Sequence, residues 1–134
     1  MPNLAYLRER RILQYGSEFF TLKPASIPAG DFTVYDIDTS TELRDAVKYK
    51  PLDFIEITNN DAVDIEVQLN FQDTFLVPKG VIKTISEKPF LAIKIKNIGV
   101  SATSTDKIVL TVQRMPITVD KYIRKFKLGQ RSIF

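Results

Sequence analysis

The sequence predicts an all-β fold, an antiparallel β-sandwich or jelly roll. Short segments of alternating apolar and polar residues follow one another closely, and Pro, Gly or Asn bounds each of them. No alternation of strands with helices, typical of a parallel sheet, is present. One strand pattern also occurs twice, which predicts an internal two-fold repeat.

The repeated pattern is a Lys-Pro dipeptide followed by an alternating strand that ends on Asn. The copies span 50–59 and 88–97 and match at the Lys, the Pro, both Ile and the Asn. A turn of aliphatic residue, Pro, any residue and Gly precedes the copies, at 27–30 and 77–80. Lys-Pro favours an extended backbone and Asn tolerates a turn, so we expect two similar halves.

In chain order, we expect a short strand at 18–23 and a second at 31–37. The polar stretch at 38–49 is expected to be a surface loop or one helical turn. The remaining strands are expected to pair as three hairpins: 54–58 with 63–69, 74–77 with 81–85, and 92–98 with 107–114. Lys94 and Lys96 would then lie across from the acidic residues Glu66 and Asp64.

Both ends of the chain differ from the strand-rich middle. Residues 3–15 are rich in good helix formers. Near the C-terminus, four apolar residues recur at helical spacing: Val119, Tyr122, Ile123 and Phe126. The opposite face of this expected helix is basic: Lys121, Arg124, Lys125 and Lys127. The chain therefore divides into an N-terminal arm (1–23), a β-sandwich domain (24–115) and a basic C-terminal helix or tail (116–134).

The formal net charge of +3 is distributed unevenly along the chain. The N-terminal arm carries +2, the sandwich domain −3 and the C-terminal tail +4. An acidic body with basic ends favours contacts between the ends and an acidic partner. A neighbouring subunit and nucleic acid are both candidates, and so is a tail that packs on its own domain with its lysines in solvent.

The residue types that are missing exclude several kinds of chemistry. The chain has no Cys and no His, which excludes Ser-His-Asp and Cys-His triads, disulfides and thiolate zinc sites. We expect no cofactor and no enzymatic activity. No apolar run is long enough to span a membrane, and the first residues lack the apolar core of a signal peptide. The expected location is a virion if the protein is viral, and otherwise the cytoplasm.

Two acidic groups are weaker candidates for a site. Residues 59–61 with Asp64 and Glu66 are acidic enough for calcium but lack the spacing of a known calcium loop. A second group resembles the carboxylates of glycoside chemistry, although acidic residues in strands usually face solvent: Asp31, Asp36 and Asp38. Phe71 and Phe75 flank a short polar stretch, and we expect them in the core rather than in a surface patch.

Three short sequence segments resemble those of a known group of proteins: Phe-Ile-Glu-Ile-Thr-Asn-Asn-Asp, Ala-Ile-Lys-Ile-Lys-Asn-Ile-Gly and Phe-Leu-Val-Pro-Lys-Gly-Val. Over residues 24–114 the chain resembles small, jelly-roll-like β-sandwich proteins from virions of bacteriophages and archaeal viruses. The resemblance implies a minor capsid, cementing, turret or tail-associated module that assembles symmetrically. It carries over no functional residue, because these segments mark the fold.

We therefore expect a structural protein that forms a homo-oligomer and docks on other structural proteins of an assembly. The expected interface residues lie in the two ends: Val119, Tyr122, Ile123, Phe126, Lys121, Arg124, Lys125, Lys127, Arg8, Arg10 and Arg11. A ligand- or carbohydrate-binding module is one alternative, although the chain has no Trp for a sugar platform. A nucleic-acid-binding accessory protein is the other, through the basic tail.

Overall fold

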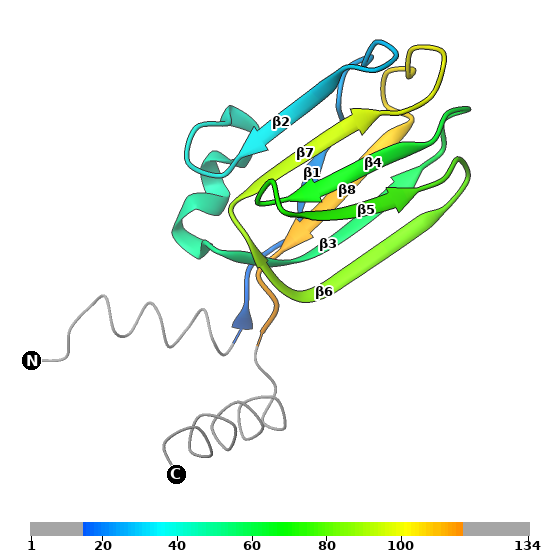
Figure 1. Ribbon diagram of the computed structural model, residues 1–134. Coiled ribbons are helices and arrows are strands. Elements are labelled where there is room, and N and C mark those ends of the chain that lie inside the picture. The colour runs from blue at the N-terminus through cyan, green and yellow to red at the C-terminus, as the bar shows by residue number, and fades with distance from the viewer. Residues whose placement is uncertain (1–14, 117–134) are drawn as a thin grey trace, which may run out of the picture.

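The computed structural model describes residues 15–116, which form eight strands and one 3₁₀ helix (Figure 1). The expected C-terminal helix and nearly all of the expected N-terminal helix lie outside these residues. The elements are β1 (Phe20–Leu22), β2 (Phe32–Asp36), η1 (Thr41–Tyr49), β3 (Leu52–Asn59), β4 (Ile65–Leu69), β5 (Asp73–Val77), β6 (Ile82–Phe90), β7 (Ala92–Asn97) and β8 (Ile108–Gln113). The predicted all-β class is confirmed.

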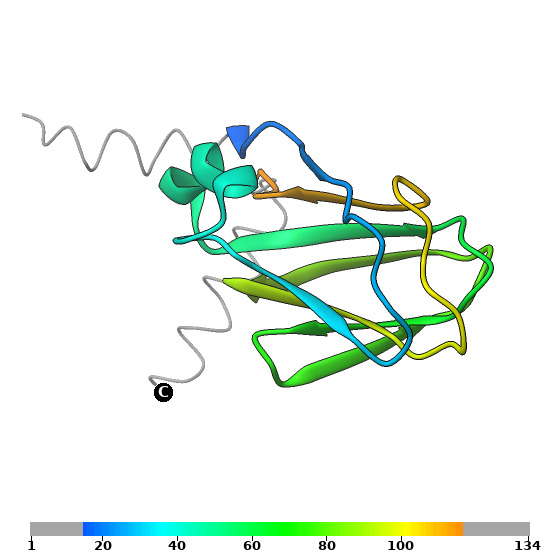
Figure 2. The same ribbon diagram turned by 90° about the horizontal axis from the view of Figure 1, so that it is seen from above.

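The strands form two four-stranded antiparallel sheets, with one order in each. The first sheet has the order β1-β8-β3-β6, and the second has the order β2-β7-β4-β5. Each strand of the first half of the chain pairs with its counterpart from the second half: β1 with β8, β2 with β7, β3 with β6, and β4 with β5. Figure 2 shows the two sheets as two layers.

All three predicted hairpins are wrong. Their strands correspond to β3 and β4, β5 and β6, and β7 and β8, and each of these pairs is divided between the two sheets. Among consecutive strands of the described region, only β4 and β5 pair with each other. Alternation along a strand shows which face is buried, but it does not show which strand lies alongside.

The two sheets contribute side chains to one hydrophobic core. Ile55 and Ile57 of β3 and Ile93 and Ile95 of β7 are fully buried in it. Burying an aliphatic side chain of this size stabilises the fold by about 1.5–3 kcal/mol. The stretch expected to be a loop or one helical turn is η1, whose buried Leu43 and Ala46 join the same cluster.

Asn59 ends β3 and is fully buried. Its side-chain amide donates to the carbonyl oxygens of Val63 (2.9 Å) and Val77 (3.0 Å). Its side-chain oxygen accepts a hydrogen bond from the backbone N–H of Asp61 (3.0 Å). The residue thereby ties the end of β3 to the loop that follows and to the end of β5.

Asn97 ends β7 and makes the matching set of bonds. Its amide donates to the carbonyl oxygens of Ile27 (2.9 Å) and Ser101 (2.8 Å), and its side-chain oxygen accepts from the N–H of Gly99 (2.9 Å). The backbone N–H of Gly30 donates to the Asn97 carbonyl, as that of Gly80 donates to the Asn59 carbonyl. The two copies of the sequence pattern thus end in the same local structure, one in each sheet.

Candidate interaction surface

The middle of the outer face of the first sheet carries little charge, and the charged residues Asp53 of β3 and Glu87 of β6 lie toward one end of these strands. We call this middle part the first outer face, and its outward side chains alternate with core residues along β1, β8, β3 and β6: Thr21, Val109, Thr111, Gln113, Phe54, Glu56, Thr58, Ile82, Thr84 and Ser86. Glu56 is the single charged residue among them. Charge depletion of this kind is typical of the centre of a protein interface.

A row of β-branched side chains crosses the middle of this face. Thr21 lies opposite Thr111, and Glu56 lies between Thr111 and Thr84. At one end of the face the rings of Phe19 and Phe54 meet edge to face, 6.2 Å apart. Phe19 on this side is 60% exposed. The first outer face therefore combines exposed apolar groups with uncharged polar ones.

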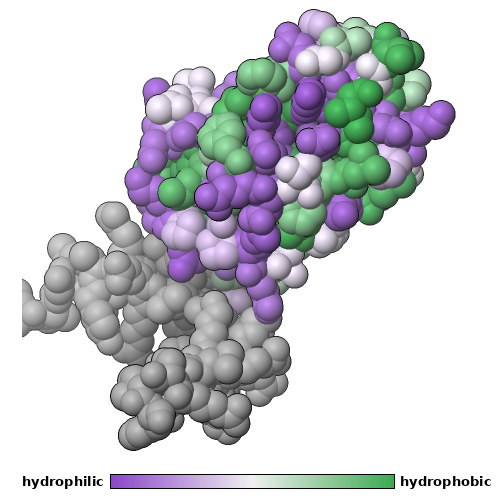
Figure 3. Space-filling model, in the orientation of Figure 1, coloured by the Kyte–Doolittle hydropathy of each residue, from purple (hydrophilic) through white to green (hydrophobic). Residues whose placement is uncertain are grey.

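The outer face of the second sheet is charged along its middle. Its outward residues on the inner strands β7 and β4 are Lys94, Lys96, Glu66 and Gln68. Lys96 lies opposite Glu66 and Lys94 lies opposite Gln68, so the predicted pairing of Lys94 with Glu66 and of Lys96 with Asp64 is wrong by two residues in register. Figure 3 views this side, where hydrophilic residues separate apolar areas. Phe32 at the β2 edge lies beneath the ammonium group of Lys94, 4.4 Å from the ring centre.

The β4–β5 turn holds an aromatic residue in an unfavourable backbone conformation. Asn70 and Phe71 have φ angles of 55° and 58°, and the N–H of Gln72 donates to the carbonyl of Leu69 (3.1 Å). Two successive positive φ angles are the pattern of a type I′ turn, whose second position usually holds Gly. Phe71 occupies that position here and is 55% exposed.

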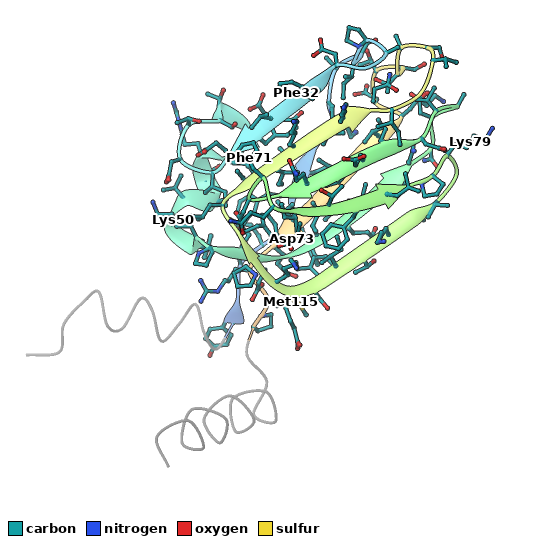
Figure 4. All side chains as sticks on the ribbon, viewed as in Figure 1. Phe32, Lys50, Phe71, Asp73, Lys79 and Met115 are labelled. Carbon is teal, nitrogen blue, oxygen red and sulfur yellow. The ribbon has the colours of Figure 1, made fainter. Side chains whose placement is uncertain are left out.

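The first and last residues of the described region lie next to each other at one end of the domain. The N–H of Ser17 donates to the carbonyl of Arg114, and the N–H of Arg114 donates to the Ser17 hydroxyl, both at 2.8 Å. The N–H of Met115 donates to the carboxylate of Asp53 (2.7 Å). Figure 4 shows Met115 and Lys50 toward one end of the domain and Lys79 at the opposite end.

The acidic candidates have structural partners. The carboxylate of Asp61 accepts the N–H of Ala62 (2.7 Å) through one oxygen and that of Ser104 (2.6 Å) through the other. It therefore joins the loops that follow β3 and β7. Asp38 forms an ion pair with Lys50 at 2.7 Å. Within residues 15–116 no group of three or more acidic side chains is placed to hold a metal ion.

Titration is shifted at one buried group among the described residues. Burial raises the pKa of the Tyr35 phenol above its ordinary value of 10.0, and the negative charge of Glu42 raises it further. Tyr35 points into the core from β2. A phenol in this position is part of the packing rather than a group poised for acid–base chemistry.

The interface residues expected from the sequence lie outside the described residues: Val119, Tyr122, Ile123, Phe126, Lys121, Arg124, Lys125, Lys127, Arg8, Arg10 and Arg11. The structure adds surfaces that the sequence analysis missed. Phe75 packs against the core, as expected, whereas Phe71 is exposed. An Asn-Phe pair where a hairpin turn usually has Asn-Gly was the available signal.

No family model matches this chain, and neither does any curated protein sequence. Across residues 15–116, no helix has the length and apolar character needed to cross a membrane. The surfaces described above are therefore the basis for an assignment of function.

Proposed function

We propose that this protein is a non-enzymatic structural subunit, a minor virion component that acts by self-association and docks on a larger assembly. The observation that carries the proposal is the first outer face, where Glu56 is the single charged side chain among the residues that define the face. Low charge together with exposed apolar groups is typical of the centre of a protein interface and suits a contact with a second copy.

The strand order supports a jelly-roll sandwich with an internal two-fold relation. If four is added to each strand number, and the count continues from β8 to β1, the order β1-β8-β3-β6 becomes β5-β4-β7-β2. This is the order of the second sheet, read from its other edge. The matching bonds of Asn59 and Asn97 obey the same shift, since they end β3 and β7. Jelly rolls of eight strands are common in viral capsid proteins, although a fold alone does not establish a function.

The size of the first outer face indicates that other contacts contribute to assembly. Four strands spaced about 4.8 Å apart, with about six residues each, give a footprint of roughly 15–20 Å by 20 Å. A stable interface buries about 800 Å² on each partner, which exceeds that footprint. The basic ends, with +2 and +4, supply further contact with the acidic domain of a neighbour, which carries −3.

The test is the solution mass of the full chain, measured by light scattering at low and high salt. We expect a defined oligomer that weakens as salt screens the basic ends. Thr111→Lys places a charge in the middle of the first outer face and should weaken association at least tenfold, or about 1.4 kcal/mol. The matched control is Gln68→Lys on the second sheet, which should leave the mass unchanged. A monomer under all conditions would refute the proposed function.

A further inference from the structure

We propose that the turn residue Phe71, together with Leu91, forms a docking platform for the C-terminal segment (117–134) of a second copy of this chain. We call these two residues the Phe71 platform. The inference rests on the proposed function, because it names the partner and the contact through which copies associate.

The backbone at Phe71 is the first observation. Its positive φ places the Cβ atom of an aromatic residue in a region that L residues avoid, and Gly would occupy the same position without strain. The side chain is also 55% exposed, so packing in the core does not offset the conformational strain. Strain of this kind is retained where a side chain is needed for a contact outside the fold.

Asn70 fixes the position of the platform. Its side-chain amide donates to the carbonyl of Pro89 (3.1 Å), and its side-chain oxygen accepts the N–H of Leu91 (2.7 Å). Its backbone N–H donates to the carbonyl of Ala92 (2.9 Å). The turn is therefore bound to the β6–β7 connection, where Leu91 is also exposed. A rigid apolar group loses little entropy when a partner binds.

The place where the chain leaves the domain identifies the occupant. The guanidinium group of Arg114 donates to the carbonyl oxygens of Tyr49 (3.1 Å) and Pro51 (3.2 Å), next to the start of β3. Leu52 at that start lies opposite Phe90, the neighbour of Leu91. The exit and the platform thus lie at the same end of the domain, and Figure 4 shows Phe71 at the end opposite to Lys79. A neighbour that approaches this end brings its own C-terminal segment to the platform.

The chemistry of the segment matches the platform. The helical spacing expected from the sequence would bring Tyr122 and Phe126 to one face, where they could contact Phe71 and Leu91, and residues 116–134 carry +4. Two carboxylates lie near the platform along the chain, because Asp73 follows the turn and Asp36 lies opposite Ala92. Two of the nearby carboxylates already pair with lysines, Asp73 with Lys88 and Asp38 with Lys50. The apolar contact therefore provides most of the affinity, and the charges orient the segment.

The decisive variant is Phe71→Gly in the full chain, studied by sedimentation over a dilution series together with thermal unfolding. We expect self-association to weaken roughly tenfold or more. We also expect the melting temperature to stay equal or to rise by about 3–6 °C, because Gly relieves the turn. Val100→Ser is the matched control, since Val100 is 99% exposed in the β7–β8 loop, and it should change neither quantity.

Phe126→Ser tests the other side of the contact. Combined with Phe71→Gly it should weaken association no further than either change alone, because both remove the same contact. An equimolar mixture of the two single variants should recover part of the association, because one copy keeps the platform and the other keeps the segment. Leu91→Ser replaces Phe71→Gly in this scheme if the glycine variant does not fold.

The outcomes separate this inference from the proposed function. If the unmodified chain associates but none of these variants weakens it, or if the effects of Phe71→Gly and Phe126→Ser add, the platform contact is wrong and self-association stands. A lower melting temperature of Phe126→Ser with no change in association would place the segment on its own domain and would also overturn the inference. A chain that is monomeric at every concentration refutes both.

Discussion

The two sheets are alike on the inside and different on the outside. Their middle strands β3 and β7 carry the repeated pattern, bury two isoleucines each and end on asparagines with matching hydrogen bonds. On the outside, the first sheet has a threonine row interrupted by Glu56, whereas the second has Lys94, Lys96 and Glu66. The shared inner features meet a requirement of folding, and the outer difference is the basis for the proposed contact with a second copy.

The largest expected effect is a loss of stability, and it tests whether Asn59 and Asn97 have equivalent roles in the two sheets. Asn59→Ala and Asn97→Ala each remove two donated bonds and one accepted bond at a fully buried site. Buried groups left without partners cost about 1–3 kcal/mol each, with partial relief from water, so each variant should lose about 3 kcal/mol of unfolding free energy. Urea denaturation measures both losses. A difference of more than about 2 kcal/mol between them would break the likeness.

A smaller effect, on self-association, tests the difference between the outer faces of the two sheets. Glu56→Thr completes the uncharged row on the first outer face, so association should strengthen severalfold, by about 1 kcal/mol. The matched control is Glu66→Thr on the second sheet, where the carboxylate lies opposite Lys96. That change should leave association unchanged in the same sedimentation measurement. Weaker association of the Glu56 variant would mean that the carboxylate itself binds the partner.

The smallest expected effect concerns Tyr35, which faces the core from β2. Its pKa is raised in the folded chain, while the unfolded chain titrates near the ordinary 10.0. Below that pH both states hold the proton, and above it the unfolded state loses the proton first, so stability falls as pH rises. Tyr35→Phe should lose less stability than the unmodified chain between about pH 9 and 11. Equal slopes of unfolding free energy against pH would contradict this.

The sequence predicts the strands well and their partners poorly. Alternation located β2, β3, β4, β7 and β8, because burial of one face is a local property of a strand. The segment at 59–61 resembles a hairpin turn, yet Asn59 directs the chain from one sheet to the other through bonds to residues far along the chain. Such bonds depend on tertiary structure, which a local pattern does not contain.

The candidate surfaces were less accessible to prediction than the strands. The residues of the first outer face stand in the sequence as the polar half of each alternation, but only the sheet order brings Thr21, Thr111 and Thr84 into one row. Exposure of Phe71 depends on the turn geometry around it. The expected tail residues remain a sequence prediction, since they lie outside the described region.

The bonds between Ser17 and Arg114 determine how the domain responds to mechanical load. Both terminal segments leave from the same end of the antiparallel β1–β8 pair. Tension between them acts on the hydrogen bonds of this pair one after another, starting at that end, rather than on all of them together. A load applied to the chain at residues 17 and 114 would therefore separate β1 from β8 before it reaches the other strand pairs.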